Sequence, residues 1–344
     1  MKIQEDIALA PLTTLGIGGP ARWFVEAASE ADIVDAVRWS RERGVPLFVL
    51  GGGSNLLVAD SGFSGLVLRV LLRGVTAESG SHGRIFRVAA GEPWDGFVER
   101  TVQEDCAGIE CLAGIPGTVG GTPVQNVGAY GQEVAETVEL VRVLDLETLK
   151  FQEMSAAECG FAYRRSIFNS TARGRFLVTR VDYQLRPGGA PNLRYADLQK
   201  AFPDGANPSL VEVAEAVRRI RRGKGMLLVE GDADCRSAGS FFKNPVISVE
   251  RFAGLTARLG QEPPHYPAGE GQVKLPAAWL IEQAGFPKGF VLGRAGISSR
   301  HTLALINRGG ATAADLLALR DSIVAAVNGR FEIALEMEPV LLGF

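Results

Sequence analysis

The stretch that decides the fold is Gly114-Ile115-Pro116-Gly117-Thr118-Val119-Gly120-Gly121-Thr122-Pro123, which runs on through Gln125-Asn126 to Gly128-Ala129-Tyr130-Gly131. Backbone that carries no side chain lets amide N–H groups approach phosphate oxygens closely. The stretch therefore favours a phosphate cradle. A glycine-rich turn in a β domain is the simpler alternative for such a sequence taken alone.

A second glycine segment, Gly51-Gly52-Gly53-Ser54-Asn55, follows a predicted strand at 46–50. A dinucleotide-binding fingerprint of the Rossmann type would open a helix at this point. Here the chain continues into strand-like runs at 56–58 and 65–68, and it lacks the lysine of a P-loop. We therefore predict a nest between two strands. Two such segments suit the two ends of an extended pyrophosphate cofactor.

The composition is that of an ordinary globular protein. The chain has 344 residues, is 46% hydrophobic and 22% charged, and predicts two or three domains. Its net charge of -3 does not suggest a general nucleic-acid binder. It contains no apolar run long enough to span a bilayer, and residues 1–6 carry no apolar signal segment, so we expect a cytoplasmic protein.

The cysteines give no sign of a metal site. They show no CxxC spacing and have no neighbouring pair of histidines, so we expect no zinc and four reduced thiols: Cys106, Cys111, Cys159 and Cys235.

Local patterns predict a β-α-β unit near the N-terminus. Residues 22–26 have the composition of a strand, and Ser29 with Asp32 forms a capping box that starts a helix ending at Gly44. The strand at 46–50 follows. Further on, we predict short strands between 84 and 185 around one helix at 94–106, followed by a linker at 187–191. We then predict three helices, which start at Ser209, span 276–284, and run from Thr312 to Asn328-Gly329, and a C-terminal strand at 331–343.

A block of possible chemical function is Ser237-Ala238-Gly239-Ser240-Phe241-Phe242-Lys243-Asn244-Pro245. The Ser240 hydroxyl lies between a glycine and two phenylalanines, where a serine can cap a turn or donate a proton from a fixed position. Near the C-terminus, Glu336 and Glu338 share one face of an extended strand, so alternation does not choose between them as a functional carboxylate.

Two groups of cations are candidates for anion binding. Arg164 lies among aromatic residues in the block 160–168 and can hold a carboxylate or an enolate, although a surface ion pair is the simpler role for an isolated arginine. A basic run from Arg218 to Lys224 ends a predicted helix, as is typical of a solvated helix terminus. If the helix continues, Arg221 and Lys224 share one of its faces.

From about Thr13 to Gly343 these blocks, in this order, resemble the UDP-N-acetylenolpyruvoylglucosamine reductase (MurB) family, flavoenzymes that make UDP-N-acetylmuramate for peptidoglycan. The most specific match is Ile115-Pro116-Gly117-Thr118-Val119-Gly120-Gly121. The block Arg194-Tyr195-Ala196-Asp197-Leu198 resembles the tyrosine loop of one class of these enzymes, and an ordinary helix start is the alternative for it.

The resemblance implies an α+β fold with a flavin domain of the vanillyl-alcohol-oxidase/PCMH type. It implies two FAD-binding subdomains, at 1–75 with the strand 330–344 returning to it and at 76–190, and a substrate-binding domain at 205–329. It also implies a ping-pong reaction: NADPH reduces non-covalent FAD and leaves, and the UDP-sugar enolpyruvyl ether then takes its place and is reduced.

The resemblance assigns roles to individual residues. Ser240 would protonate the substrate carbon, while Arg164 and Glu338 would stabilise the enolate; Glu336 stays a second candidate because Pro339 departs from the family pattern. Residues implied to bind the cofactor are Gly51, Gly52, Gly53, Ser54, Asn55, Gly114, Ile115, Pro116, Gly117, Thr118, Gly120, Gly121, Asn126, Gly128, Ala129, Val178 and Arg221. Those implied to bind the substrate are Tyr163, Tyr195, Lys224, Asn244, Lys274 and His301.

Two other function classes are less well supported. An FAD-dependent alcohol oxidase of the same flavin superfamily often attaches its flavin to a histidine, but His82, His265 and His301 all lie outside the glycine segments. A non-enzymatic nucleotide-binding protein would not require the set of Ser240, Arg164 and Glu338. We expect a monomer that acts on a small molecule and binds neither nucleic acid nor membrane.

Overall fold

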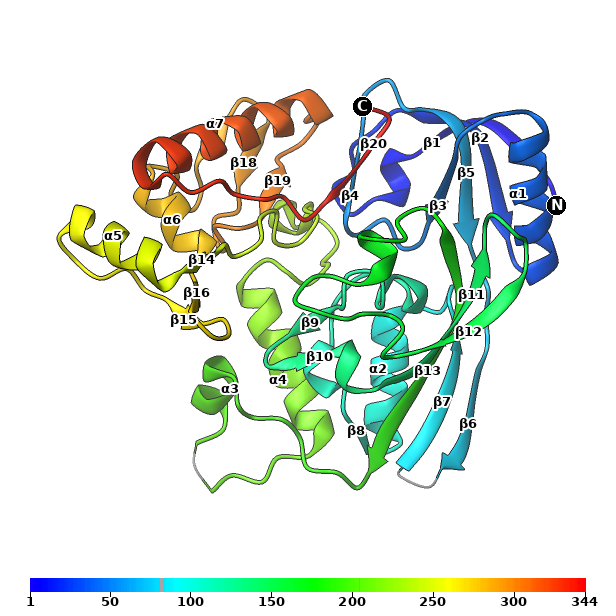
Figure 1. Cartoon of the computed structure of the whole chain (residues 1–344), viewed down its shortest axis with the longest axis horizontal. Coiled ribbons are helices and arrows are strands. Elements are labelled where there is room, and N and C mark those ends of the chain that lie inside the picture. The colour runs from blue at the N-terminus through cyan, green and yellow to red at the C-terminus, as the bar shows by residue number, and fades with distance from the viewer. Residues whose placement is uncertain (81–82, 204) are drawn as a thin grey trace. The chain divides into compact units, whose positions relative to one another are not determined.

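The computed structural model describes residues 1–80, 83–203 and 205–344, so His82 lies outside the described residues. The chain forms two compact units (Figure 1). Unit 1 contains residues 1–7, 21–53 and 64–222, and unit 2 contains residues 8–20, 54–63 and 223–344. Each has its own buried core. The division into three domains stays a prediction.

The first sheet of unit 1 confirms the predicted succession of strand, helix and strand. Its order is β1 (Gln4–Ala8), β2 (Pro20–Ala27), β5 (Phe63–Val70) and β3 (Leu47–Leu50). Helix α1 (Glu30–Glu42) begins at the predicted capping box, in which Ser29 and Asp32 each accept the backbone N–H of the other. Strand β5 runs parallel to β3 and lies between β2 and β3.

The second sheet of unit 1 is antiparallel and carries helix α2 (Trp94–Gln103) against it. Its order is β12 (Phe151–Ser155), β11 (Val138–Asp145), β13 (Phe176–Pro187), β7 (Gly83–Ala89) and β6 (Val75–Gly80), with β8 (Cys106–Ala107) paired to β13. Aromatic pairs join helix and sheet: the ring centroids of Phe86 and Phe97, and those of Trp94 and Tyr183, are 5.8 Å apart. The predicted helix is confirmed and ends three residues earlier than expected.

Unit 1 ends in two helices, α3 (Ala196–Ala201) and α4 (Leu210–Gly223). The predicted capping pair at the start of α4 is confirmed, because Glu212 accepts the Ser209 N–H at 2.8 Å and Ser209 accepts the Glu212 N–H at 3.2 Å. Val213 and Val217 are buried on the same face as Arg221, so an arginine ends an otherwise apolar stripe.

Unit 2 packs three helices with short strands. The helices are α5 (Val249–Leu259), α6 (Ala277–Gln283) and α7 (Ala313–Phe331). The strands form three small sheets: β14 (Val246–Ser248), β16 (Gln272–Lys274) and β15 (Tyr266–Pro267); β17 (Val291–Leu292), β18 (Ala295–Ile297) and β19 (Leu305–Asn307); and β20 (Val340–Leu342) parallel to β4 (Leu56–Val58).

The C-terminal tail corrects two boundaries predicted from the sequence. Helix α7 begins at the expected cap, Thr312, but continues past 328–329 to Phe331, whose side chain is buried. The strand expected over 331–343 reduces to β20 and a single bridge between Met337 and Phe242. Burial of Phe331 explains the longer helix, because a residue that packs in the core stabilises the turn that carries it.

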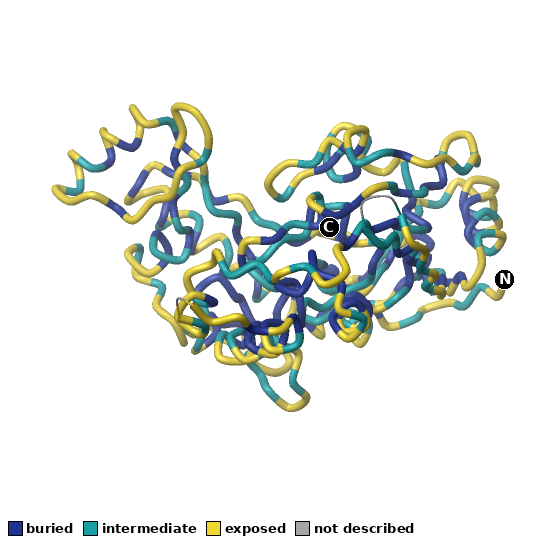
Figure 2. Tube along the Cα trace, turned by 90° about the horizontal axis from the view of Figure 1, so that it is seen from below, coloured by how far each residue is buried: buried dark blue, intermediate teal, exposed yellow. Residues whose placement is uncertain are grey.

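Buried residues concentrate on the inner strands and helix faces, and many loops are exposed (Figure 2). All four cysteines are buried and unpaired by disulfides, and burial raises the pKa of the Cys159 thiol to about 12. Across the described ranges, no helix combines the length and the apolar character needed to cross a membrane.

Candidate functional site

The two predicted cofactor segments of unit 1, 51–53 and 114–121, pack closely against each other. A methyl group added at Gly52 would stand 2.5 Å from the Gly117 Cα, and one added at Gly51 would stand 2.8 Å from the Thr118 Oγ1. Real Cβ atoms do not approach this closely, so the contact requires glycine. The structure therefore brings Gly51 and Gly52 into contact with Gly117 and Thr118, more than sixty residues away in the sequence.

Gly114 is held from both sides by charged side chains. Asp95, in the first turn of α2, accepts the Gly114 N–H at 2.6 Å. Arg221 of α4 donates from Nε to the Gly114 carbonyl at 3.0 Å. Arg218, one turn earlier in α4, pairs with the same Asp95 carboxylate at 2.8 Å. The first residue of the deciding stretch is thus fixed by α2 and α4.

Arg221 is an unusual residue because its guanidinium is buried. Its side chain has only 6% exposure, and burial lowers its pKa, while a hydrogen bond to Tyr130 opposes that shift. Buried charges require partners, and here they include the Gly114 carbonyl, the Tyr130 phenol and the nearby Asp95 carboxylate. Cofactor binding by Arg221 stays a prediction; in this structure its Nε holds the Gly114 carbonyl.

The second half of the stretch is locked to its neighbours. Gly120 donates to the Ala90 carbonyl at 2.8 Å, and a methyl group there would lie 2.6 Å from the Ala90 Cβ. Asn126 has φ of 46° and donates to Glu133 and to the Ala162 carbonyl. The other cofactor candidates in unit 1 are Ile115, Pro116, Gly128 and Ala129, which are half-buried, Gly121, which is exposed, and Val178, which is buried on β13.

Arg164 lies at the tip of a tight turn in which Ala162 and Arg165 exchange both backbone hydrogen bonds. Its φ is 53°, a left-handed conformation that costs a non-glycine residue energy and is often found at functional sites. Its Nη2 donates to the Gly128 carbonyl at 2.9 Å, and its guanidinium lies 5.5 Å from the Tyr163 ring centre. The turn is therefore tied to the glycine stretch.

Tyr195 immediately precedes α3 and is 41% exposed. The helix start that was the alternative for this block is present, while the substrate-binding role of Tyr195 stays a prediction. Its ring meets that of Tyr130 edge to face, with the centroids 5.3 Å apart at an angle of 84°.

In unit 2, the segments that carry Ser240 and Glu338 run side by side. Phe242 pairs with Met337 in an antiparallel bridge. On its two sides Glu338 donates its N–H to the Phe241 carbonyl and Lys243 donates to the Glu336 carbonyl, both at 2.9 Å. The half-buried Ser240 directly precedes this pairing, so two residues almost a hundred positions apart belong to one small structure.

The two candidate carboxylates have different surroundings. The Glu336 side chain is 73% exposed and forms an ion pair with Lys243. Glu338 is half-buried, and its carbonyl accepts the Asn55 Nδ2 at 3.2 Å, while Asn55 in turn accepts the Val340 N–H at 3.0 Å. A catalytic carboxylate needs a partly dehydrated position, which the half-buried Glu338 meets better than the exposed Glu336, and the choice of Glu338 stays a prediction.

The remaining substrate candidates of unit 2 are Asn244, Lys274, His301 and Lys224. Asn244 accepts the Ala277 N–H at the start of α6 at 2.9 Å. Lys274, on β16, pairs with Val246 of β14, which lies two residues after Asn244. His301 is half-buried in a turn where its N–H is donated to the Ser298 hydroxyl at 3.3 Å. Lys224 follows the last residue of α4, so the helix ends before its predicted shared face with Arg221 is complete.

Sequence reasoning missed Asp95 and Tyr130 as members of this arrangement. Asp95 begins a helix, where an acidic residue is expected for the helix dipole alone. Tyr130 was part of the deciding stretch, and a large aromatic residue among glycines is the signal that could have singled it out.

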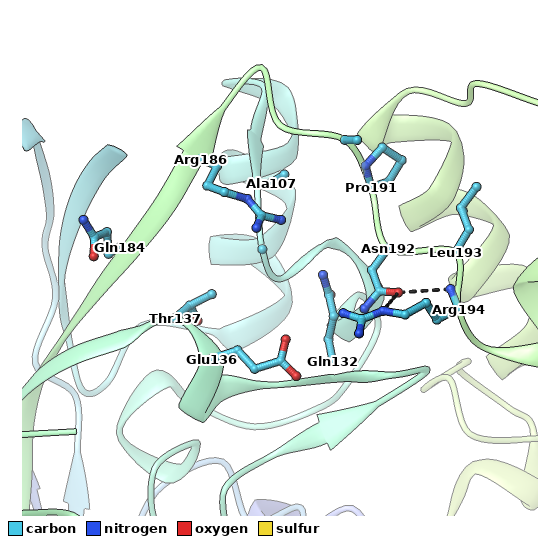
Figure 3. A pocket seen from close by; sticks show the side chains of 12 residues that line it. Ala107, Gln132, Glu136, Thr137, Gln184, Arg186, Pro191, Asn192, Leu193 and Arg194 are labelled. Atoms are coloured by element: carbon cyan, nitrogen blue, oxygen red, sulfur yellow. Dashed lines mark hydrogen bonds between the residues drawn. The ribbon is translucent and has the colours of Figure 1, made fainter. Parts of the chain in front are cut away.

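A cavity of about 320 Å³ in unit 1 contains none of the predicted site residues. It lies beside the segment that leads to Tyr195, and Figure 3 shows Asn192, Arg194, Glu136 and Arg186 around it. The cavity is therefore lined by residues 190–194, which precede Tyr195, and not by the glycine segments 51–53 and 114–121.

Comparisons with known proteins find relatives that match nearly the whole chain. Residues 231–342 match the family model described as "UDP-N-acetylenolpyruvoylglucosamine reductase, C-terminal domain", and residues 21–148 match "FAD binding domain". A UDP-N-acetylenolpyruvoylglucosamine reductase of Thermobifida fusca is 50% identical over 98% of this chain and 98% of its own length. One from Streptomyces coelicolor is 47% identical over 99% of this chain and 91% of its own.

A solved structure also resembles the whole chain. The crystal structure of UDP-N-acetylenolpyruvylglucosamine reductase (MurB) from Thermus caldophilus superposes with a TM-score of 0.69 at 28% identity, and the match covers 99% of each chain.

Proposed function

The chain belongs to the UDP-N-acetylenolpyruvoylglucosamine reductase family, and we propose that the residues brought together in each unit carry out that family's reaction. The protein is an FAD-dependent oxidoreductase with an α+β fold of the vanillyl-alcohol-oxidase type. It uses NADPH to reduce UDP-N-acetylglucosamine enolpyruvate to UDP-N-acetylmuramate, a precursor of peptidoglycan. The observation that carries this assignment is the match to a reductase of this family at 50% identity over 98% of both chains.

The residues of unit 1 fit FAD. A pyrophosphate needs backbone N–H groups that no side chain shields. Within the paired segments, the N–H groups of Gly114 and Gly120 are already donated to Asp95 and to the Ala90 carbonyl, so we propose that those of 51–53 and 117–118 face the pyrophosphate. When bound, FAD supplies the two-electron chemistry, accepting hydride from NADPH and passing it to the methylene carbon of the substrate. Asp95 and Arg221 keep Gly114 in place, so the cradle does not need to be organised by the cofactor.

Arg164 and Glu338 are proposed to stabilise the negative charge that develops on the substrate as the carbon next to its carboxylate gains electron density. A guanidinium can hold a carboxylate through paired hydrogen bonds. A carboxyl group assists an enolate only by donating a hydrogen bond, which requires a protonated form of Glu338. The hydrogen bond from Arg164 Nη2 to the Gly128 carbonyl supports its role, because it fixes the guanidinium in advance.

Ser240 is proposed to deliver the proton that completes the reduction. The hydroxyl is held between Gly239 and the buried Phe241, whose backbone pairs with Leu303 and Glu338. A serine is a weak acid, so it works only if the enolate is comparably basic and the geometry is fixed. The pairing of its segment with that of Glu338 supplies such a fixed backbone.

We propose that the sugar nucleotide is held by Tyr163, Tyr195, Lys224, Asn244, Lys274 and His301. Lysines and tyrosine hydroxyls suit diphosphate oxygens, and the amide of Asn244 suits a sugar or uracil group. Since the Asn244 oxygen accepts the Ala277 N–H, its NH₂ group is the part that can reach the substrate. We also propose that the protein acts in the cytoplasm, since UDP-sugars and NADPH are made inside the cell, and that it is a monomer.

We expect the purified protein to be yellow and to carry FAD without a covalent bond, because neither glycine segment contains a histidine. Acid precipitation followed by spectra of the supernatant and the pellet measures this. All flavin is expected in the supernatant. Flavin retained on the precipitated chain would favour an alcohol oxidase of the same superfamily.

A matched pair of variants links the flavin to the proposed cradle. Gly52→Ala is expected to purify with little flavin, since its methyl group meets the Gly117 Cα at 2.5 Å. Gly329→Ala in α7 adds a methyl group that meets no atom within 4 Å, and it is expected to keep the native flavin content. Equal flavin contents in the two variants would contradict the cradle.

Replacing Tyr195 by alanine is expected to weaken sugar-nucleotide binding by roughly 10- to 100-fold, the size of a lost hydrogen bond to a charged group. Reduction of the flavin by NADPH is expected to stay near the native rate, because Tyr195 lies outside both glycine segments. Stopped-flow spectra of the two half-reactions test this. A large loss in the NADPH half-reaction, with the fold intact, would mean that Tyr195 supports the cofactor instead.

A further inference from the structure

Tyr130 is a residue for which the reaction above has no use, yet its environment is highly specific. It is 8% exposed and has φ of 50°, which is uncommon for a bulky residue and requires support from its surroundings. Its ring stands edge to face against that of Tyr195, at a centroid distance of 5.3 Å. The exposed Tyr195 therefore packs against Tyr130, a buried aromatic residue in a strained backbone conformation.

The other side of Tyr130 faces the cofactor segment. Arg221 hydrogen-bonds Tyr130 and also donates to the Gly114 carbonyl at 3.0 Å. Because Arg221 is buried, losing one of its partners would leave part of a charge unpaired, so its position depends on Tyr130. The chain of contacts from Tyr195 to Gly114 passes through two side chains only.

The segment that carries Tyr130 is also tied to the turn of Arg164. Arg164 donates to the Gly128 carbonyl at 2.9 Å, and Asn126 donates to the Ala162 carbonyl at 3.1 Å. Gly128 and Asn126 lie within four residues of Tyr130. Any displacement of the Tyr130 backbone would therefore also displace Arg164, the proposed enolate-binding residue.

The segment before Tyr195 is anchored beside Tyr130 and not only through its ring. Asn192 donates from Nδ2 to the Gly131 carbonyl at 2.8 Å, and it receives the Arg194 N–H at 3.0 Å, as Figure 3 shows. The fully buried Glu110 accepts the Asn192 N–H at 2.9 Å and the Gln132 side chain at 2.7 Å. Residues 192–194 are thus fixed, while the 41% exposed Tyr195 packs its ring against that of Tyr130.

We propose that Tyr130 is a positioning residue that couples the substrate-binding Tyr195 to the cofactor segment at Gly114. Its ring sets the place of Tyr195, and its hydroxyl, through Arg221, sets the place of Gly114. The proposal rests on the proposed function, since it needs Tyr195 to bind the sugar nucleotide. It separates two roles of one side chain, and each has its own variant.

The test is a double-mutant cycle on binding of UDP-N-acetylglucosamine enolpyruvate and on the two half-reactions. Tyr130→Ala is expected to weaken substrate binding by about 3- to 10-fold, which corresponds to the strength of an aromatic pair. In a Tyr195→Ala background the same change is expected to alter binding by less than about twofold, because the partner ring is already gone. Tyr130→Phe keeps the ring, so it is expected to restore substrate binding.

The role of the Tyr130 hydroxyl is tested by measuring FAD retention and the flavin spectrum. Tyr130→Phe removes the hydrogen bond to Arg221, and we expect weaker FAD retention and an altered flavin spectrum in this variant with substrate binding near native. Trp39→Phe serves as the control: Trp39 pairs edge to face with Trp23 at 5.6 Å, away from both glycine segments in sequence, and neither readout is expected to change.

The outcomes distinguish this proposal from the proposed function. Equal effects of Tyr130→Ala in the native and the Tyr195→Ala backgrounds would overturn the coupling, and so would a Tyr130→Phe variant with an unchanged flavin. If Tyr130→Ala does not fold, Tyr130→Leu takes its place in the same cycle. A native enzyme that NADPH reduces but the enolpyruvyl substrate does not reoxidise would refute the proposed function itself.

Discussion

Replacing Ser240 by alanine is expected to leave reduction of the flavin by NADPH at the native rate and to slow its reoxidation by the enolpyruvyl substrate by about 10²- to 10⁴-fold. The hydroxyl acts only as the acid that protonates the substrate carbon, and general acids contribute rate factors of this size. Anaerobic single-turnover reoxidation measures the second step alone. The half-buried Ser240 sits in a backbone fixed by the Phe241–Glu338 hydrogen bond, so removal of the hydroxyl should not disturb the fold.

Two further variants make the serine result specific. Ser240→Cys is expected to regain part of the activity, because a thiol can also donate a proton. Ser237→Ala, in the same block, removes a buried hydroxyl for which no catalytic role is proposed, and it is expected to reoxidise at the native rate. If Ser240→Ala reoxidises as fast as the native enzyme, Ser240 is structural and the acid is Glu338, Glu336 or a water molecule.

Replacing Glu338 by alanine is expected to lower the rate of the substrate half-reaction by about 10²- to 10³-fold, as removal of one group that stabilises an oxyanion does in other enzymes. The NADPH half-reaction is expected to be unchanged. Glu336→Ala is the matched control, because it removes the same group two residues away and breaks only an exposed ion pair with Lys243. Such surface pairs contribute little to stability.

Rapid-mixing kinetics of both variants decide between the two carboxylates. A defect in Glu336→Ala as large as that expected for Glu338→Ala would reverse the assignment. Glu338→Gln adds a detail of mechanism: an amide can donate a hydrogen bond, so this variant is expected to keep more activity than the alanine variant if the carboxyl group acts in its protonated form.

Local sequence signals predicted α1, α2, α4, α6 and α7, but not α5 (Val249–Leu259). Ser29 with Asp32 and Thr312 with Asp315 are capping boxes that lie within one turn of the chain, so no tertiary information is needed to find them. The glycine stretch was informative for the same reason, since glycine at such positions points to close backbone approach. Its partner segment at Gly51 was also visible, but the contact between Gly52 and Gly117 required the fold.

What the sequence alone left open depends on contacts between distant residues. Alternation treats Glu336 and Glu338 alike, and only the pairing with the segment after Ser240 separates them. The tail beyond Phe331 has the alternation of a strand, but only its residues 340–342 form one, β20, which pairs in parallel with β4. Tyr130 and Tyr195 are 65 positions apart, so no local pattern could have shown their ring contact.

The central claim is that this chain passes electrons from NADPH to an enolpyruvyl sugar nucleotide through bound FAD. The direct test is an anaerobic titration followed by its absorbance spectrum. We expect NADPH to bleach the flavin, and UDP-N-acetylglucosamine enolpyruvate then to restore the oxidised spectrum with one UDP-N-acetylmuramate formed per flavin. A flavin that stays reduced in the presence of this substrate, but is reduced from its oxidised form by an alcohol, would contradict the account.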